Sequence, residues 1–188
     1  MSPLPPPDEM PVRAVGARRI RPGVPATTTI VRTLRELASE SPALVSLLDA
    51  RSIAGERHLL SAWAHLGRAR SRGESRLRDR GAEFALYVAG DDQLPRALSK
   101  VGVSDSTEQF VLVAERPLDP VALLPRFELT EDPTAFPRPI DEEVLDRLGV
   151  EPVERSAVPR SAWEGLVLER VALLELSAPA ARAPPKRH

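Results

Sequence analysis

Apolar residues recur at helical spacing in two stretches of the chain. In residues 55–70 they form one stripe, and the charged side chains lie away from it: Leu59, Ala62, Trp63, Leu66 and Ala69. After Asp91 and Asp92, the second stripe has the spacing i, i+3, i+4, i+7: Leu94, Ala97, Leu98 and Val101. These patterns predict two helices, and the second is capped by the aspartates and ends at Gly102.

Less regular patterns predict three more helices. The first follows the cap-type residues Thr27–Thr29 and ends before Pro42, with its apolar positions at Ile30, Val31, Leu34 and Leu37. The other two are shorter and span residues 140–148 and 160–171. In the last of them, one side of the helix is apolar: Trp163, Leu166, Val167 and Val171.

Near-continuous apolar runs between turn residues predict strands instead. Residues 12–20, with the sequence VRAVGARRI, form the first strand, which Gly16 is expected to weaken or bulge. Four more runs have the same character: residues 44–50, 83–89, 109–115 and 172–176. Prolines divide the stretch from Pro117 to Pro139, so that only short elements are expected there.

The order of these elements indicates the class of fold. Strands and helices alternate loosely rather than strictly, and no internal repeat is visible. We therefore expect an α+β fold with a single domain, in which helices pack against a mixed, largely antiparallel sheet.

Proline is the unusual feature of the composition. Its 20 positions among 188 residues are roughly twice the usual share of about 5%. Only Pro95 lies between Ala43 and Arg116, so this middle stretch is expected to be the most regular. The prolines and polar ends predict a disordered lead over residues 1–10, a domain over residues 11–178 and a flexible tail over residues 179–188.

The composition also excludes several classes of protein. The chain has no cysteine, so it has no disulfide framework, thiolate metal site or cysteine nucleophile. No run approaches the roughly 20 apolar residues that span a bilayer. The first ten residues, MSPLPPPDEM, have neither the basic start nor the apolar stretch of a secretory signal. We therefore expect a cytoplasmic protein with no membrane partner.

Charge is balanced overall but unevenly distributed. The formal net charge is −1, which by itself implies no polyanionic partner. Between Arg51 and Arg80, however, eight arginines face three acids, and between Glu115 and Glu154 eleven acids face four arginines. Such a distribution can give a local positive field, although solvated helix and loop faces are the ordinary explanation.

The sequence offers no convincing catalytic or cofactor site. It lacks the glycine-rich patterns of the common nucleotide-binding loops. His58 and His65 lie about 10 Å apart along one predicted helix, too far to share a metal ion. Ser61 lies between them, but only Asp49 or Glu56 offers an orienting acid, and no strained turn exposes the serine. We predict no enzyme, no metal, no cofactor and no small-molecule substrate; a hydrolase using Ser61 is the weakest alternative.

The basic segment is the best remaining candidate site. Arg76, Arg78 and Arg80 alternate, so in an extended loop all three side chains would project to one side. With three neighbouring arginines they would neutralise several phosphates of a nucleic acid: Arg57, Arg70 and Arg72. The segment lacks interleaved aromatic residues for base stacking, and a solvated loop is the alternative interpretation.

Three segments in this order resemble a known family. They are VSLLDARSIAGERHLLSAWAHLGRAR, GAEFALYVAGDDQLPRALSKVGVSDSTEQFVLVAE and LERVALLEL. The chain resembles, over roughly residues 12–177, the small tRNA-recruiting subunit of the KEOPS complex, the PRPK-binding protein family. The proline-rich ends and residues 119–139 depart from the compact pattern of the archaeal members.

The resemblance implies a non-catalytic function. KEOPS attaches a threonylcarbamoyl group to the adenosine next to the anticodon of ANN-decoding tRNAs. The family to which this chain is similar binds the kinase-like ATPase subunit of that complex, and through it the transferase subunit. It also captures the single-stranded 3′ CCA end of tRNA.

This resemblance adds polar candidates to the basic segment. Specificity for a CCA end needs contacts to base edges in addition to phosphate pairing. The side chains of His58, Glu83 and Gln93 are the candidates for such contacts, although each is equally suited to a structural role. The alternative function is a protein-interaction module that regulates a kinase-like ATPase without binding RNA.

Overall fold

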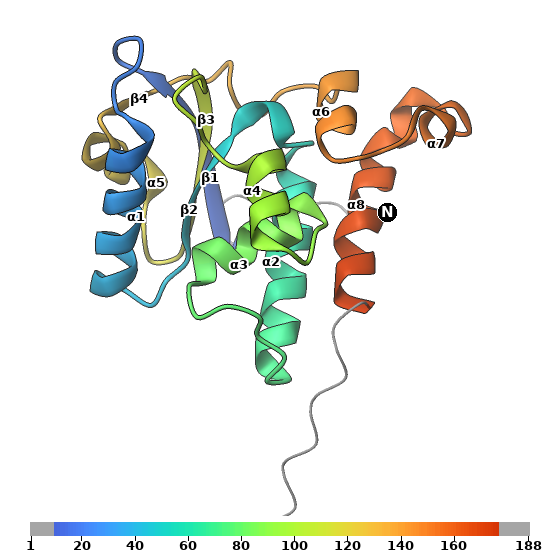
Figure 1. Cartoon of the computed structure of the whole chain (residues 1–188), viewed down its shortest axis with the longest axis horizontal. Helices are drawn as coiled ribbons and strands as arrows, with labels where there is room; N and C mark the ends of the chain where they lie inside the picture. Colours follow the sequence, from blue (N-terminus) through green and yellow to red (C-terminus); the bar gives the residue numbers. More distant parts are fainter. Residues whose placement is uncertain (1–9, 177–188) are drawn as a thin grey trace, which may run out of the picture.

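Four strands form a central antiparallel sheet (Figure 1). The computed structural model describes residues 10–176. Within this range the strands lie in the order β2-β3-β1-β4, with these bounds: β1 (Val12–Arg19), β2 (Val45–Asp49), β3 (Gln109–Glu115) and β4 (Leu129–Glu131). Each neighbouring pair is antiparallel, which confirms the predicted α+β class with helices packed on a largely antiparallel sheet.

Both faces of the sheet are buried. Successive side chains of a strand point to opposite faces, and in β3 Val111 and Val113 enter one core whereas Phe110 and Leu112 enter the other. A strand that is buried on both faces has a continuous apolar sequence. This is why QFVLVAE shows no alternation of polar and apolar residues and was still predictable as a strand.

One face of the sheet is covered by three elements, on the left of Figure 1: α1 (Thr27–Glu40), α5 (Pro120–Leu123) and η3 (Leu124–Phe127). Ile30 and Leu37 of α1 are buried here with Phe127. The core on this face is the smaller of the two.

The other face carries a thicker layer of four helices: α2 (Glu56–Ser71), α3 (Arg80–Ala89), α4 (Leu94–Val101) and α8 (Trp163–Leu176). Short elements complete this side: η2 (Ala50–Ser52), α6 (Glu142–Arg147), α7 (Pro152–Ser156) and η4 (Arg160–Ala162). α3 lies inside the layer and contacts α2, α4, α8 and β2.

The strand predicted over residues 83–89 is wrong, because this segment belongs to α3. A short apolar run is equally compatible with a buried strand and a helix buried on all sides. Phe84, Leu86 and Tyr87 are at most 1% exposed although they point in different directions around the helix. Two signals in the sequence favoured a helix: Asp79 caps its start by accepting from the Ala82 amide, and Gly90 ends it in the left-handed conformation.

The closing strand predicted over residues 172–176 is also wrong, because α8 continues to Leu176. Its buried positions keep the helical period to the end: Trp163, Val167, Val171 and Leu174. The prediction failed because the run Ala172–Leu176 was considered apart from the helical pattern that precedes it.

Two features of the sheet differ from expectation. β4 lies in the proline-rich stretch, where the sequence predicted only short elements and no strand. Gly16 does not bulge β1, whose register with β3 is continuous. Instead, a Cβ at Gly16 would lie 2.4 Å from the Asp132 carbonyl oxygen, so the glycine lets the chain after β4 cross β1 closely.

The other predicted elements are confirmed: strands at β1, β2 and β3, and helices at α1, α2, α4, α6 and the first part of α8. The lead and tail predicted at the two ends lie almost entirely outside the described residues. No helix between residues 10 and 176 is both long and apolar enough to cross a bilayer.

Candidate nucleic-acid interface

The arginines of the basic segment do not share one surface. Arg57 lies in the first turn of α2, where its Nε is 4.0 Å from a Glu164 carboxylate oxygen. Arg70 lies in the last turn of the same helix, about 20 Å further along the axis. Arg57 is therefore separated from the rest of the predicted set.

Two more arginines turn toward α8. Arg72 Nη2 lies 2.5 Å from Glu175 Oε1, and Arg76 Nη2 donates to the Leu174 carbonyl oxygen at 3.0 Å. Glu175 also accepts from Arg68 and His65. Partial burial raises the pKa of Glu175, but hydrogen bonds from Arg68, Arg72 and His65 lower it to about 2. We call Glu175 with His65, Arg68, Arg72 and Arg76 the α8 cluster.

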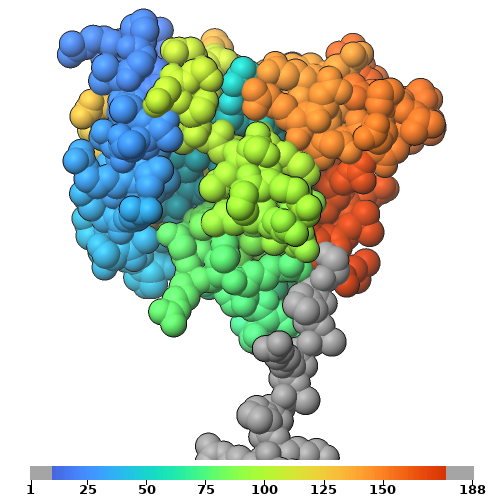
Figure 2. All heavy atoms as spheres, in the orientation of Figure 1, coloured from blue at the N-terminus to red at the C-terminus, as the bar shows by residue number. Residues whose placement is uncertain are grey.

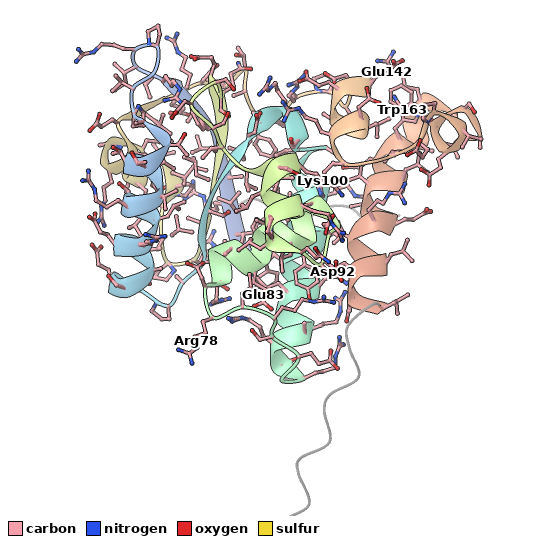
Figure 3. The ribbon with its side chains drawn as sticks, in the orientation of Figure 1. Arg78, Glu83, Asp92, Lys100, Glu142 and Trp163 are labelled. Atoms are coloured by element: carbon pink, nitrogen blue, oxygen red, sulfur yellow. The ribbon has the colours of Figure 1, made fainter. Side chains whose placement is uncertain are left out.

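Glu83 is an internal anchor for the loop that carries the arginines. Its carboxylate is completely buried and accepts from the Arg76 amide at 2.5 Å and from Ser75 Oγ at 3.0 Å. Arg70 Nε lies 3.2 Å from Glu83 Oε2, the oxygen that also accepts from Ser75. Figure 3 shows Glu83 inside the helical layer. The prediction that Glu83 contacts a base is therefore corrected: it holds residues 70–76 in place.

His58 is also part of the core. Its ring is fully buried, with Nδ1 accepting from the Ala54 amide at 3.2 Å and Nε2 lying 2.9 Å from the Val88 carbonyl oxygen. Because Nδ1 accepts, the ring proton is on Nε2 and is donated to Val88. Burial lowers the pKa of His58 to about 4, against the opposing effect of the Val88 carbonyl. This neutral, buried ring is not available to RNA, contrary to the prediction.

Gln93, the third polar candidate, remains at the surface. It is exposed at the start of α4, and its backbone N–H donates to Asp91 Oδ1 at 3.0 Å. It does not line either of the hollows described next.

The structure brings three of the predicted arginines together at the edge of the sheet. Two adjoining hollows of about 190 and 320 Å³ lie between α1 and the start of α3, over the edge strand β2. Figure 2 shows the surface hollowed here, between α1 in blue and the green α3–α4 region. We call the two together the β2-edge groove. Its rim carries four arginines: Arg35, Arg70, Arg78 and Arg80.

The floor of the β2-edge groove is mainly apolar: Leu34, Val45, Leu47 and Ala85. Gly81 makes this arrangement possible, because a Cβ at Gly81 would lie 2.2 Å from the Val45 carbonyl oxygen. α3 can therefore begin directly against the edge of β2. Leu98, which is 47% exposed, forms part of the wall on the side of α4.

Two of the four rim arginines are paired with carboxylates, and the other two are exposed. Arg80 is bound to Glu115 at 2.7 Å and Arg70 to Glu83, so both are largely neutralised. Burial raises the pKa of Glu115, but the Leu44 amide, Arg80 and Trp63 together hold it below its ordinary value. Arg35 and Arg78 are exposed, and no carboxylate within residues 10–176 pairs with either guanidinium. One acid, Asp79, shares the lining, where it caps α3.

Among the arginines predicted to bind RNA, Arg78 is the one whose guanidinium has no hydrogen bond or ion pair within residues 10–176. Figure 3 shows its side chain projecting away from the ribbon at the lower mouth of the groove. The expectation that Arg76, Arg78 and Arg80 project to one side is wrong, because Arg76 joins the α8 cluster and Arg80 joins Glu115. Sequence reasoning missed Arg35, although its place outside the apolar stripe of α1 marked it as a surface residue.

The alternative catalytic arrangement is not assembled. His58 bonds to Ala54 and Val88, and His65 bonds to Glu175, so neither ring is directed to Ser61 by a hydrogen bond in the described structure. No group of three histidine or acidic side chains within residues 10–176 is placed to hold a metal ion.

No protein-family model matches this chain, and no curated protein matches it either.

Proposed function

We propose that this protein is a non-catalytic subunit of KEOPS that binds the 3′ CCA end of tRNA and the kinase-like ATPase. It would thereby support threonylcarbamoyl modification of the adenosine next to the anticodon. The proposal rests on the three sequence segments that resemble the family, together with their order along the chain. It also rests on one structural observation, the β2-edge groove with its free arginines.

The β2-edge groove has the properties that a single-stranded RNA end requires. Its apolar floor can pack against bases, while Arg78 and Arg35 on opposite walls can pair with phosphates. Two small adjoining hollows suit a few unpaired nucleotides better than a duplex. With two free guanidinium groups, we expect few phosphate contacts and a moderate salt dependence.

Residues within the segments that carry the resemblance mostly hold α3 and the loop before it in place. Glu83 fixes the arginine loop, and His58 ties the turn before α2 to α3. Gly90 allows α3 to end against α8, since a Cβ there would lie 2.9 Å from Arg170 Cβ. These positions support a structural contribution of the shared motifs and leave contact with RNA to exposed side chains.

A binding subunit can contribute to modification without any catalytic group. Holding the 3′ end of the tRNA would turn the encounter between the anticodon region and the transferase into an event within one complex. The gain is in effective concentration, and it requires only that the subunit bind the tRNA and the ATPase at the same time.

The alternative, a module that regulates the ATPase without RNA, is favoured by a different surface. The outer side of α8 exposes Leu173 and Leu176 by 55% and 82%. An apolar surface of this kind suits a protein partner and is separate from the β2-edge groove.

Titration of the protein with intact tRNA and with tRNA lacking CCA tests the proposal. We expect intact tRNA to bind at least about tenfold more tightly, because the groove takes unpaired nucleotides. The variant R78E should reduce binding of intact tRNA, since it replaces a free cation with an anion at the mouth of the groove. Single substitution is preferable to reversing Arg76 and Arg80, both of which hold the fold together.

The matched control is R160E, which makes the same change of charge at a distance from the β2-edge groove. Arg160 stacks on Trp163, 4.9 Å from its ring centroid, and Figure 3 shows Trp163 on the side of the molecule opposite α1. R160E should leave tRNA binding unchanged. Equal binding of the two tRNAs, or no binding of either, would contradict the proposed function, and the second result would favour the alternative.

A further inference from the structure

We propose that α1 provides a second RNA contact, for the phosphates of the acceptor stem that follow the single-stranded end. This inference rests on the proposed function and extends it from the β2-edge groove to the neighbouring helix. The occupant of this surface is the sugar–phosphate backbone of RNA.

The charges of α1 differ in how firmly they are paired. Its acids are held by an arginine from the segment before β4: Arg126 lies 2.5 Å from Glu40 and 4.0 Å from Glu36. The hydrogen bond from Arg126 lowers the pKa of Glu40, so this carboxylate stays ionised and paired. Of the basic residues of α1, Arg35 lines the β2-edge groove, and Arg32 makes only a contact of 3.9 Å with Glu36, its i,i+4 neighbour.

The surface formed by these basic residues is continuous with the β2-edge groove. A shallow hollow of about 300 Å³ is lined by Thr27, Thr28, Val31, Arg32 and Arg35. Val31 and Arg35 also line the larger part of the groove. A chain leaving the groove past Arg35 therefore meets Arg32 next, three residues earlier and about one turn along α1.

The chemistry of this surface favours a polyanion over a peptide. Both guanidinium groups are exposed, and the weak contact of Arg32 with Glu36, at 3.9 Å, is solvated. The hollow is open and offers the Thr28 hydroxyl and one partly exposed valine, Val31, rather than deep pockets for side chains, while the Thr27 hydroxyl donates to Asp105 at 2.7 Å. Phosphate binding needs charge and hydroxyl donors without such pockets, whereas specific peptide recognition needs them.

Arg32 separates the two RNA contacts experimentally, because it lines the shallow hollow and not the β2-edge groove. Two probes are compared: intact tRNA, and a short single-stranded oligonucleotide that ends in CCA. We expect R32E to weaken binding of intact tRNA by about fivefold and to reduce the slope of log K against log salt by about 0.9, as expected for one duplex phosphate contact. Binding of the oligonucleotide should be unchanged.

R78E serves as the positive control, because it should weaken binding of both probes, and R160E as the negative control. The melting temperature of each variant is measured to confirm that it is folded. If wild-type protein binds both probes and R32E leaves tRNA binding unchanged, this inference is overturned while the proposed function stands. An equal effect of R32E on both probes would overturn it too, since Arg32 would then belong to the groove.

If wild-type protein binds neither probe, the proposed function itself fails. A polyglutamate peptide provides the last comparison. Should this peptide bind wild-type protein as tightly as tRNA at the same salt concentration and lose its binding in R32E, the surface would be a site for acidic protein segments. That result would overturn the inference. We expect polyglutamate to bind at least about tenfold more weakly, since it cannot also fill the β2-edge groove.

Discussion

The α8 cluster and the β2-edge groove carry arginines from the same short segment, yet the two regions have opposite properties. In the α8 cluster, Arg68 and Arg72 are bound to one carboxylate, Glu175. In the groove, Arg78 is exposed and pairs with no acid within residues 10–176. An arginine that is already paired would have to give up its partner before it could bind a phosphate. The number of arginines in a segment is thus a poor measure of a nucleic-acid site, and the free ones decide.

The largest loss of stability is expected when Glu83 is replaced, because it anchors the loop whose arginines reach both regions. In E83Q, Arg70, whose side chain is 24% exposed, loses its counter-charge, so we expect a loss of unfolding free energy of up to about 3–5 kcal/mol, the range for a fully buried pair. Unfolding in urea measures this loss. E74Q is the control, because Glu74 pairs with Arg72 at the surface and such a pair contributes under about 1 kcal/mol. Equal stability of the two variants would mean that Glu83 does not anchor the loop.

The next largest loss of stability is expected when the close contact between α3 and β2 is widened. The added methyl of G81A would lie 2.2 Å from the Val45 carbonyl oxygen, so we expect a loss of about 1–3 kcal/mol by overpacking. The same change at Gly67, on the exposed side of α2 with nothing within 4 Å, should stabilise the protein by up to about 1 kcal/mol. Thermal unfolding distinguishes the two glycines, and a neutral G81A would show that the groove wall has room to move.

The α8 cluster predicts a specific dependence of stability on pH. The pKa of Glu175 is about 2 in the folded protein, below its ordinary value of 4.5. A lowered pKa adds stability above pH 4.5, and this contribution is lost as the pH falls from 4.5 toward 2. We expect E175Q to be about 1–2 kcal/mol less stable than wild type at pH 7. The difference should vanish near pH 2; a difference independent of pH would contradict the ion-pair explanation.

The smallest effect on stability is expected at the free arginine. R78E should change the unfolding free energy by less than about 0.5 kcal/mol, as for an exposed residue without partners. R72E makes the same change of charge inside the α8 cluster, so we expect it to lower the melting temperature and to leave RNA binding intact. If R72E abolished RNA binding and R78E left it intact, the paired arginines, rather than the free one, would contact RNA.

Much of the fold was predictable from local patterns, and the errors have a common cause. The stripes at α2 and α4 were recognisable because one side of each helix faces solvent. α3 was mistaken for a strand because Phe84, Leu86 and Tyr87 are buried on all sides, which removes the polar positions that reveal a period. β4 has only three residues, too few for a pattern, and depends on pairing with β1.

The site was predicted less well than the fold. Arg78 and the basic segment were identified from spacing and charge, and Arg35 was missed because it lies in another element of the sequence. His58 and Glu83 were chosen for their polarity, but polarity does not reveal whether a side chain points into the core. Their buried partners, the Val88 carbonyl for His58 and the Arg76 amide for Glu83, meet them only in the folded chain.

The sequence by itself determined the α+β class, the order of most elements, the absence of cysteine chemistry and the concentration of arginines before α3. Only the tertiary structure decided which arginines are free, because this depends on acids far away in the chain: Glu115 for Arg80 and Glu175 for Arg72. Pairing over such distances in the sequence leaves no local pattern. It arises when α8 packs beside α2 and when the edge of β2 is brought against α3.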